Sequence, residues 1–153
     1  MVRRTVILAA AITAGGGCVA PRPTTAPAQQ EEALRLLLPQ RIEIVGPFTR
    51  VRSFDEDDMP DGIELLLQAV NSLDDPGLML VGDVRVELYE FVPASADHKG
   101  RRLECWTVEL DTPQKQRTYW NDVTQMYEFR LGIDPSRIPP AERFVLAVTY
   151  TSP

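Results

Sequence analysis

The stretch Asp83-Val-Arg-Val-Glu-Leu-Tyr-Glu-Phe91 alternates apolar and polar residues over most of its length. Successive side chains of a β-strand point to opposite faces, so this period of two predicts a strand with one buried face. Val84, Val86 and Leu88 are expected to face the core, and the charged residues between them are expected to face solvent. The strand therefore predicts a layered β-fold around it.

The same alternation recurs on both sides of this strand, and short turn-forming stretches separate the runs. No segment beyond residue 40 combines the periodicity and the length of a helix. Clusters of Asp, Pro, Gly and Ser mark the turns. About seven strands in residues 40–153 predict an all-β domain built as a two-sheet β-sandwich. The other predicted strands are 41–45, a shorter one around 48–51, 62–70, 102–110, 125–131 and 143–150; the turns are 59–62, 74–77, 98–100, 111–113 and 134–136.

In outline, the predicted sandwich resembles immunoglobulin-like and transthyretin-like domains, and the choice between them stays open. The last predicted strand reaches Tyr150, and the sequence ends at Pro153. Either this strand completes the sheet at its edge, or the sequence is a shortened version of a longer domain. In the second case an unpaired edge would invite association with another chain.

The first 17 residues have the three-part layout of a secretory signal peptide. Arg3 and Arg4 form a basic start, an apolar run follows over 6–14, and small residues come next. The apolar run is about half the length of roughly 20 residues that a bilayer-spanning helix needs. We therefore expect export without a permanent transmembrane helix. The paired arginines leave a twin-arginine export signal open as an alternative.

Gly16-Gly17-Cys18 resembles the lipobox of bacterial lipoproteins, although Gly15 stands where that pattern usually has leucine. The resemblance implies that Cys18 becomes the lipidated first residue of the mature protein and anchors it to a membrane. Val19 after the cysteine implies, by the same resemblance, the outer membrane of the cell envelope, facing the periplasm. The alternative is cleavage by the general signal peptidase around Gly16 or Ala20.

Residues 18–39 are interpreted as a disordered, lipid-anchored tether and lead-in. The composition from Val19 to about Gln30 is Ala, Pro, Thr and Gln, which is typical of an extended and solvated linker. The leucine-rich stretch 31–38 can form two helical turns before Pro39 ends them. We expect its apolar residues to pack on the domain as a lead-in rather than to form an independent helix.

Short motifs spread over residues 54–150 resemble those of a group of small bacterial lipoproteins. The resemblance supports the β-sandwich fold, and it names no activity and implies nothing about chemistry. The motifs are Phe54-Asp55, Pro60-Asp-Gly-Ile-Glu64, Leu88-Tyr-Glu90, Tyr119-Trp120 and Val148-Thr-Tyr150.

The chain is acidic, with a net charge of −6 over 153 residues, and loss of the signal peptide removes two positive charges. Nucleic acids and anionic membrane surfaces require clustered lysine and arginine, so we expect no nucleic-acid partner. If Cys18 carries the lipid, Cys105 has no intrachain cysteine partner and is expected to be a small buried hydrophobic residue. Without lipid, a Cys18–Cys105 disulfide is formally possible in an oxidising compartment.

The stretch 54–64 gathers five carboxylates at close spacing, and closely spaced oxygen ligands are what calcium binds. It faintly resembles the Asp-rich loops of EF-hands and thrombospondin type 3 repeats, although Met59 and the late Gly62 depart from their pattern. The simpler interpretation is an exposed acidic hairpin loop with β-turn chemistry. The candidate metal ligands are Asp55, Asp57, Asp58, Asp61 and Glu64.

The adjacent aromatics Tyr119 and Trp120 lie between two predicted strands. Exposed aromatic side chains on a sandwich can bind a glycan or a peptide strand, whereas buried ones pack the core, and packing is the favoured interpretation. Trp106 is expected to face opposite to Cys105 on its strand.

Catalysis has little support, and we expect a protein that is not an enzyme. His98 is the only histidine and lies in a charged turn, where a catalytic base would lack a fixed position. Ser95 or Cys105 acting with His98 is the remaining catalytic arrangement. Two function classes result: a non-catalytic envelope lipoprotein that presents loops or an edge strand to another envelope protein, or a calcium-dependent or glycan-binding surface module.

Overall fold

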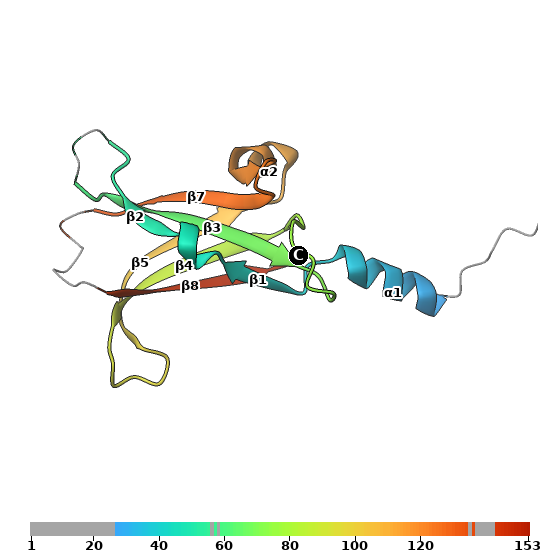
Figure 1. Ribbon diagram of the computed structural model, residues 1–153, viewed down its shortest axis with the longest axis horizontal. Coiled ribbons are helices and arrows are strands. Elements are labelled where there is room, and N and C mark those ends of the chain that lie inside the picture. The colour runs from blue at the N-terminus through green and yellow to red at the C-terminus, as the bar shows by residue number, and fades with distance from the viewer. Residues whose placement is uncertain (1–26, 56, 58, 135, 137–142) are drawn as a thin grey trace, which may run out of the picture.

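A computed structural model describes residues 27–55, 57, 59–134, 136 and 143–153. Two antiparallel sheets form a sandwich-like arrangement, with one short helix before it and one at its end (Figure 1). The elements are α1 (Pro27–Leu37), β1 (Arg41–Ile44), the 3-10 helix η1 (Gly46–Phe48), β2 (Arg50–Arg52), β3 (Gly62–Val70), β4 (Asp83–Phe91), β5 (Lys99–Glu109), α2 (Pro113–Tyr119), β6 (Trp120–Asn121), β7 (Met126–Gly132) and β8 (Phe144–Thr151).

One sheet has five strands and the other has three. In the larger sheet the order is β1-β3-β7-β6. β1 and β2, which η1 separates along the chain, pair with the same edge of β3, one after the other. In the smaller sheet β4 is central, with β5 on one side and β8 on the other. Every strand pair in the described part of the chain is antiparallel. The prediction of an all-β sandwich is confirmed.

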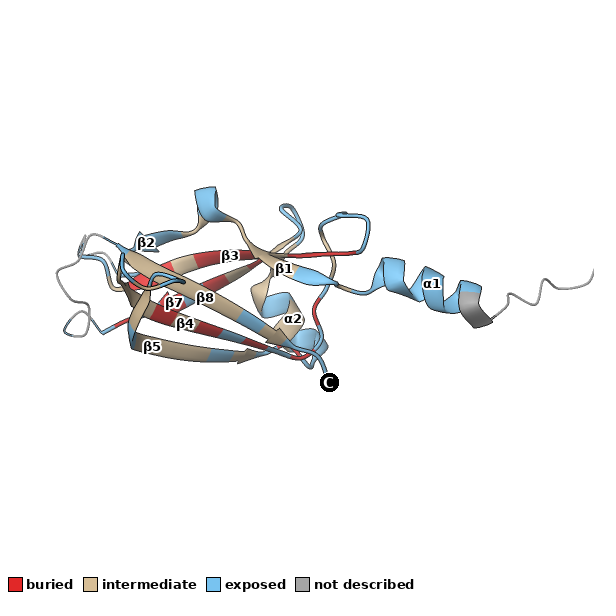
Figure 2. Ribbon diagram, turned by 90° about the horizontal axis from the view of Figure 1, so that it is seen from below, coloured by how far each residue is buried: buried red, intermediate tan, exposed pale blue. Residues whose placement is uncertain are grey.

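The alternating strands bury the faces that their sequence predicted. Val84, Val86 and Leu88 of β4 are buried and face the larger sheet, while Arg85 is exposed on the outer face. β3 and β7 supply most of the opposite layer, with seven core side chains exposed by less than a tenth: Ile63, Leu65, Leu67, Ala69, Tyr127, Phe129 and Leu131. Figure 2 shows the buried segments concentrated on β3, β4 and β7. The core thus lies between the two central strand pairs.

A second helix, α2, lies beyond residue 40, where the sequence has no segment with both helical periodicity and helical length. At seven residues, α2 is too short to show helical periodicity. Its start carries the usual local signals: the Thr112 hydroxyl accepts a hydrogen bond from the Lys115 amide at 3.3 Å, and Pro113 occupies the first turn. The turn predicted at 111–113 is therefore the start of a helix.

The lead-in helix α1 begins at Pro27, so the tether predicted to be extended up to Gln30 is helical over its last four residues. The expectation that its leucines pack on the domain is also wrong. Leu34 and Leu37 are 56% and 70% exposed, and Figure 1 shows α1 projecting away from the sheets. The buried Asn71 side chain donates to the Leu36 carbonyl oxygen at 3.0 Å. Among the described residues no helix has the length and apolar character of a membrane span.

The hydroxyl of Tyr127 connects α2 to the core. It accepts a hydrogen bond from the Leu80 amide at 2.8 Å and lies 2.7 Å from the Gln116 side-chain oxygen, to which it donates. Gln116 in turn donates to the carbonyl oxygens of Leu80 and Leu110. Burial raises the pKa of Tyr127, so its hydroxyl stays protonated near neutral pH. This network holds α2 over one end of the sandwich.

Tyr127→Phe is expected to lower the free energy of unfolding by about 1–3 kcal/mol, because it leaves the buried Leu80 amide without a partner. Urea unfolding followed by tryptophan fluorescence measures the change. The matched control is Tyr150→Phe, which removes a hydroxyl that donates to the solvent-accessible Val81 carbonyl oxygen. Equal losses for the two variants would contradict this role of Tyr127.

Candidate functional site

Among the described predicted metal ligands, Asp55, Asp57 and Asp61 lie in the loop between β2 and β3, and Glu64 lies in β3. Residues 1–26, which include Cys18, and Asp58 lie outside the described residues. Asp61 accepts a hydrogen bond from the Phe54 amide at 2.7 Å, and Asp57 accepts one from the Met59 amide at 2.9 Å. These contacts use the carboxylates as turn-stabilising acceptors within their own loop. No group of three or more potential ligands suited to a metal occurs in the part of the chain that the structure describes.

Glu64 lies apart from that loop, on the outer face of β3, and makes two ion pairs. Its carboxylate accepts from Arg50 at 3.0 Å and from Arg52 at 2.8 Å. Burial alone would raise the pKa of Glu64, but these two guanidinium groups outweigh it and lower the pKa. A calcium ion would have to displace both arginines to use this carboxylate.

Tyr119 and Trp120 are half-buried and pack against the core. The Tyr119 ring lies 5.3 Å from that of Phe129, and the Trp120 ring meets Tyr127 edge-on at 5.0 Å. These are the spacings of favourable aromatic pairs within a core. The arrangement favours packing for both side chains and leaves their outer edges as the surface that a ligand would meet. Figure 1 shows α2, which ends at Tyr119 and directly precedes Trp120, at the end of the sandwich opposite the β2–β3 loop.

The remaining catalytic candidates are engaged elsewhere. The Ser95 hydroxyl donates to Asp97 at 2.8 Å, and the His98 ring packs against Phe91 at 5.2 Å. Cys105 is only partly buried and pairs across the strands with Glu87, on the outer face of the smaller sheet. The expectation that Cys105 is a buried hydrophobic residue is therefore wrong, whereas Trp106 does face the opposite side, toward the core.

Glu87 on that outer face accepts hydrogen bonds from Arg102 at 2.8 Å and from Arg85 at 2.9 Å. These two bonds lower the pKa of Glu87 to about 2 from an ordinary value of 4.5. Because the folded-state pKa is the lower one, the stabilising contribution is complete above pH 4.5 and is lost as the pH falls toward 2. Glu87, Arg85 and Arg102 thus form an ion-pair network between β4 and β5, in which the Glu87 carboxylate is already paired and is not available as a catalytic acid or base.

We expect Glu87→Gln to lower the melting temperature at neutral pH and to have little effect near pH 2, where about half of the wild-type Glu87 carboxyls are protonated in the folded protein. Thermal melting of both proteins across this pH range tests the expectation. The difference should narrow as the pH falls below about 4.5. A difference that stays constant down to pH 2 would rule out ionisation of Glu87 as its cause.

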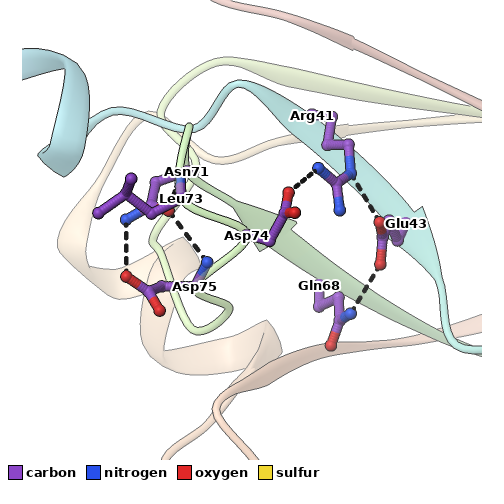
Figure 3. A network of polar contacts seen from close by, with 7 residues as sticks. All are labelled: Arg41, Glu43, Gln68, Asn71, Leu73, Asp74 and Asp75. Carbon is purple, nitrogen blue, oxygen red and sulfur yellow. Dashed lines mark hydrogen bonds and ion pairs between the residues drawn. The ribbon is translucent and has the colours of Figure 1, made fainter.

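A second polar network joins β1 to the loop after β3 (Figure 3). Arg41 pairs with Glu43 and with Asp74, and Glu43 also accepts from Gln68 at 2.9 Å. Within the loop, the Asn71 side-chain oxygen accepts from the amides of Leu73 and Asp75. Each charge shown has a partner, so the network fixes the loop beside β1 and offers no unsatisfied group to a ligand.

The edge strands differ in how they are protected against pairing with another chain. β1, β2 and β5 all carry charged residues along their length, and the edge strand β6 is only two residues long. β8, with the sequence Phe-Val-Leu-Ala-Val-Thr-Tyr-Thr, has none, and it pairs only with β4 among the described strands. Natural proteins commonly blunt exposed edges with charges, proline or bulges. β8 is therefore an eight-residue edge strand that has no charged residue or proline to prevent pairing with another chain.

Two hollows open beside β8, between it and the edge of the larger sheet. The first, the β2–β8 hollow, has a volume of about 440 Å³ and contains Val51, Ile63, Phe144 and Leu146 in its lining. The second, the β1–β8 hollow, has a volume of about 380 Å³ and is lined in part by Ile42, Val148 and Tyr150. Together they follow β8 from its first residue to its seventh. Both volumes fall in the range of small binding sites.

No protein-family model matches the chain, and no curated protein or solved structure matches it. A functional inference therefore depends on the geometry of the β8 edge and the two hollows beside it.

Sequence reasoning recognised β8 as a strand but not the hollows beside it. Val51 and Leu146 are 95 positions apart along the chain, and only the packing of the two sheets brings them to one hollow. The available signal was the absence of charge over Phe144–Thr151, which marks an unusual edge only when the strand is known to lie at one.

Proposed function

We propose that this chain is a membrane-anchored envelope lipoprotein without catalytic activity, whose sandwich is a binding module for another envelope protein. The observation that carries the proposal is the uncharged open edge of β8, bordered by two hollows. Unpaired strand edges recognise partners through main-chain hydrogen bonds, and adjacent pockets select side chains.

The anchor part of the proposal rests on the sequence of residues 1–18. A basic start, a short apolar run and Gly-Gly-Cys before a proline-rich stretch support export and attachment of lipid to the Cys18 thiol. Because one acyl chain gives only marginal membrane binding, stable attachment requires the several chains of a lipoprotein cysteine or a second membrane contact. The acidic composition supports a protein partner rather than nucleic acid.

The anchor is tested by substituting Cys18→Ser in the full chain and fractionating cells that express it. Loss of the lipid attachment point should move the protein from the membrane fraction to the soluble fraction. Cys105→Ser is the matched control, since it removes the other thiol and leaves the lipobox intact. Unchanged membrane association of the Cys18→Ser protein would refute the anchor.

The binding part is tested by covalent cross-linking in intact envelopes, followed by capture of the full chain. The expected result is a cross-linked envelope protein whose yield falls when Val51, which is 53% exposed beside β8, is replaced in Val51→Asp. Val123→Asp, at a 92% exposed turn position, controls for the added charge. Equal yields from the two variants would place binding elsewhere on the module.

The second candidate function, a calcium-dependent or glycan-binding module, uses Asp55 to Glu64 or the Tyr119–Trp120 pair. Its support is the density of carboxylates in the β2–β3 loop. Because Asp57 and Asp61 already accept backbone hydrogen bonds and Glu64 is paired with two arginines, we expect millimolar calcium to leave the melting temperature unchanged. A clear rise in melting temperature with calcium would favour this second function.

A further inference from the structure

The open edge of β8 also indicates what kind of segment it accepts; this step rests on the proposed binding function and specifies the partner. We propose that an extended segment of the partner adds to β8 as an antiparallel strand, with apolar residues at alternate positions and a carboxylate near its C-terminal end. Three features carry the proposal: the free backbone edge, the spacing of the two hollows, and the charge at one end of β8.

The backbone edge sets the direction of the added strand. β8 pairs with β4 over eight residues, from Phe144 opposite Glu90 to Thr151 opposite Asp83. Its other side faces no strand in the described part of the chain. Antiparallel pairing is slightly more stable per residue than parallel pairing, and it is the arrangement of the described strands of this fold. An antiparallel partner strand ends, at its C-terminal side, next to Phe144.

The hollows set the pattern of side chains. Phe144 and Leu146 line the β2–β8 hollow, and Val148 and Tyr150 line the β1–β8 hollow, so residues two apart on β8 face them in turn. An added strand has the same period of two, and one of its faces lies over both hollows. Ile42, Val51 and Ile63 supply apolar side chains on the far wall, next to the charged Arg41 and Arg50. Apolar residues at alternate positions of the partner would therefore lose water there, and the residues between them would face solvent.

The charge lies at the Phe144 end of the β2–β8 hollow. Arg143 lines this hollow, and its guanidinium group lies 5.8 Å from the centre of the Phe91 ring. Within the described residues, Arg143 has no ion pair with a carboxylate. Arg50 lines the same hollow but is paired with Glu64. A carboxylate at the C-terminal end of an antiparallel partner would lie beside Arg143.

A second copy of this chain fits the hollows less well than a free segment does. In a second copy the inward-facing residues Phe144, Leu146 and Val148 pack against that copy's own core. They are therefore not available to enter the hollows of the first copy. A segment with no sheet behind it can place side chains in both.

The test uses a fluorescein-labelled heptapeptide amide with valine at alternate positions, threonine between them and aspartate at the C-terminal end. Its binding to the purified full chain is followed by fluorescence anisotropy. We expect saturable binding. Moving the aspartate to the N-terminal end should weaken binding by up to about fivefold, as expected for a solvent-exposed ion pair with Arg143. Two further peptides carry N-methyl groups on alternate backbone nitrogens, so that each peptide has one of its two hydrogen-bonding edges blocked. Only the peptide whose blocked edge faces β8 should lose binding.

Two pairs of protein variants locate the peptide. Val51→Asp should weaken binding about tenfold or more, because it introduces a charge into an apolar contact, whereas Val123→Asp should have no effect. Arg143→Glu should weaken binding of the C-terminal aspartate peptide more than that of its N-terminal counterpart. Arg117→Glu makes the same charge change on α2, away from both hollows, and should leave binding unaltered.

Three outcomes would overturn the proposal. Absence of peptide binding is one, and equal binding by both N-methylated peptides is another, since neither fits strand addition. The third is a stable homodimer of the full chain that cross-links through β8 and does not yield to the peptide, which would make a second copy the occupant. These outcomes leave the Cys18→Ser fractionation and the envelope cross-linking unaffected, so failure here is distinguishable from failure of the proposed function.

Discussion

Phe129→Ala is expected to lower the free energy of unfolding by about 3–5 kcal/mol, the range for removing a large aromatic side chain from a packed core. Phe129 is fully buried on β7, stacked 5.9 Å from Tyr127 and 5.3 Å from the Tyr119 ring. It is also paired across the strands with Leu65 of β3, another fully buried residue. Truncation would leave a cavity bounded by two sheets and by α2, which cannot all close in together.

Urea unfolding at equilibrium measures this loss, with the slope of the transition as a check that the unfolded state is unaltered. Phe48→Ala is the matched control, because Phe48 is 58% exposed at the end of η1 and its removal creates no enclosed cavity. The control should cost less than about 1 kcal/mol. Similar costs for the two variants would mean that the core does not centre on β3 and β7.

Gly82→Ala is expected to cost at least about 2 kcal/mol, from two effects that add. Gly82 has a φ of +136°, a backbone conformation that residues with a side chain rarely adopt. A Cβ atom there would also lie 2.2 Å from the Thr151 carbonyl oxygen and 3.1 Å from Ser152 Cα. Both neighbours are backbone atoms at the end of β8, so relief of the clash must displace that strand.

Gly46→Ala provides the comparison, since a Cβ atom at Gly46 meets nothing within 4 Å. Thermal melting of both variants gives the stability difference, and amide hydrogen exchange shows where it acts. We expect Gly82→Ala to increase exchange in β8 and in Leu110, whose amide donates to the Gly82 carbonyl oxygen at 2.7 Å. A Gly82→Ala protein as stable as Gly46→Ala would contradict the clash.

The strands were predictable because their burial follows a local period of two. β4 shows this most clearly, and its inward and outward residues match the expectation from Val84 to Leu88. β3 departs from the pattern at Leu65-Leu66-Leu67, where three consecutive leucines are buried. Leu66 faces outward yet is only 8% exposed, because the segment that includes η1 covers it, and the Val45 amide donates to its carbonyl oxygen. The burial of Leu66 could not be predicted from the alternation of residues within β3.

The candidate sites were less predictable, because ligand geometry depends on contacts distant in sequence. The acidic stretch from Asp55 to Glu64 is dense in carboxylates, but Glu64 enters β3 and meets Arg50 and Arg52 across the strand pair. Tyr119 and Trp120 are adjacent in the sequence, and α2 and the two-residue strand β6 turn both of them toward the core. In both cases strand pairing decided which neighbours the side chains met.

By itself, the sequence determined the all-β class, the approximate positions of seven of the eight described strands and the inward face of β4, since these depend on alternation and turn residues over a few positions. It also contains the signal-like start and Cys18, on which the proposed anchor rests. Only the tertiary structure decided that β8 lies at an edge, that it borders β1 and β2 across two hollows, and that Arg143 stands at one end of them. The physical reason is that strand order and sheet packing bring together segments up to about a hundred residues apart, and no local pattern encodes which edge of a sheet is left open.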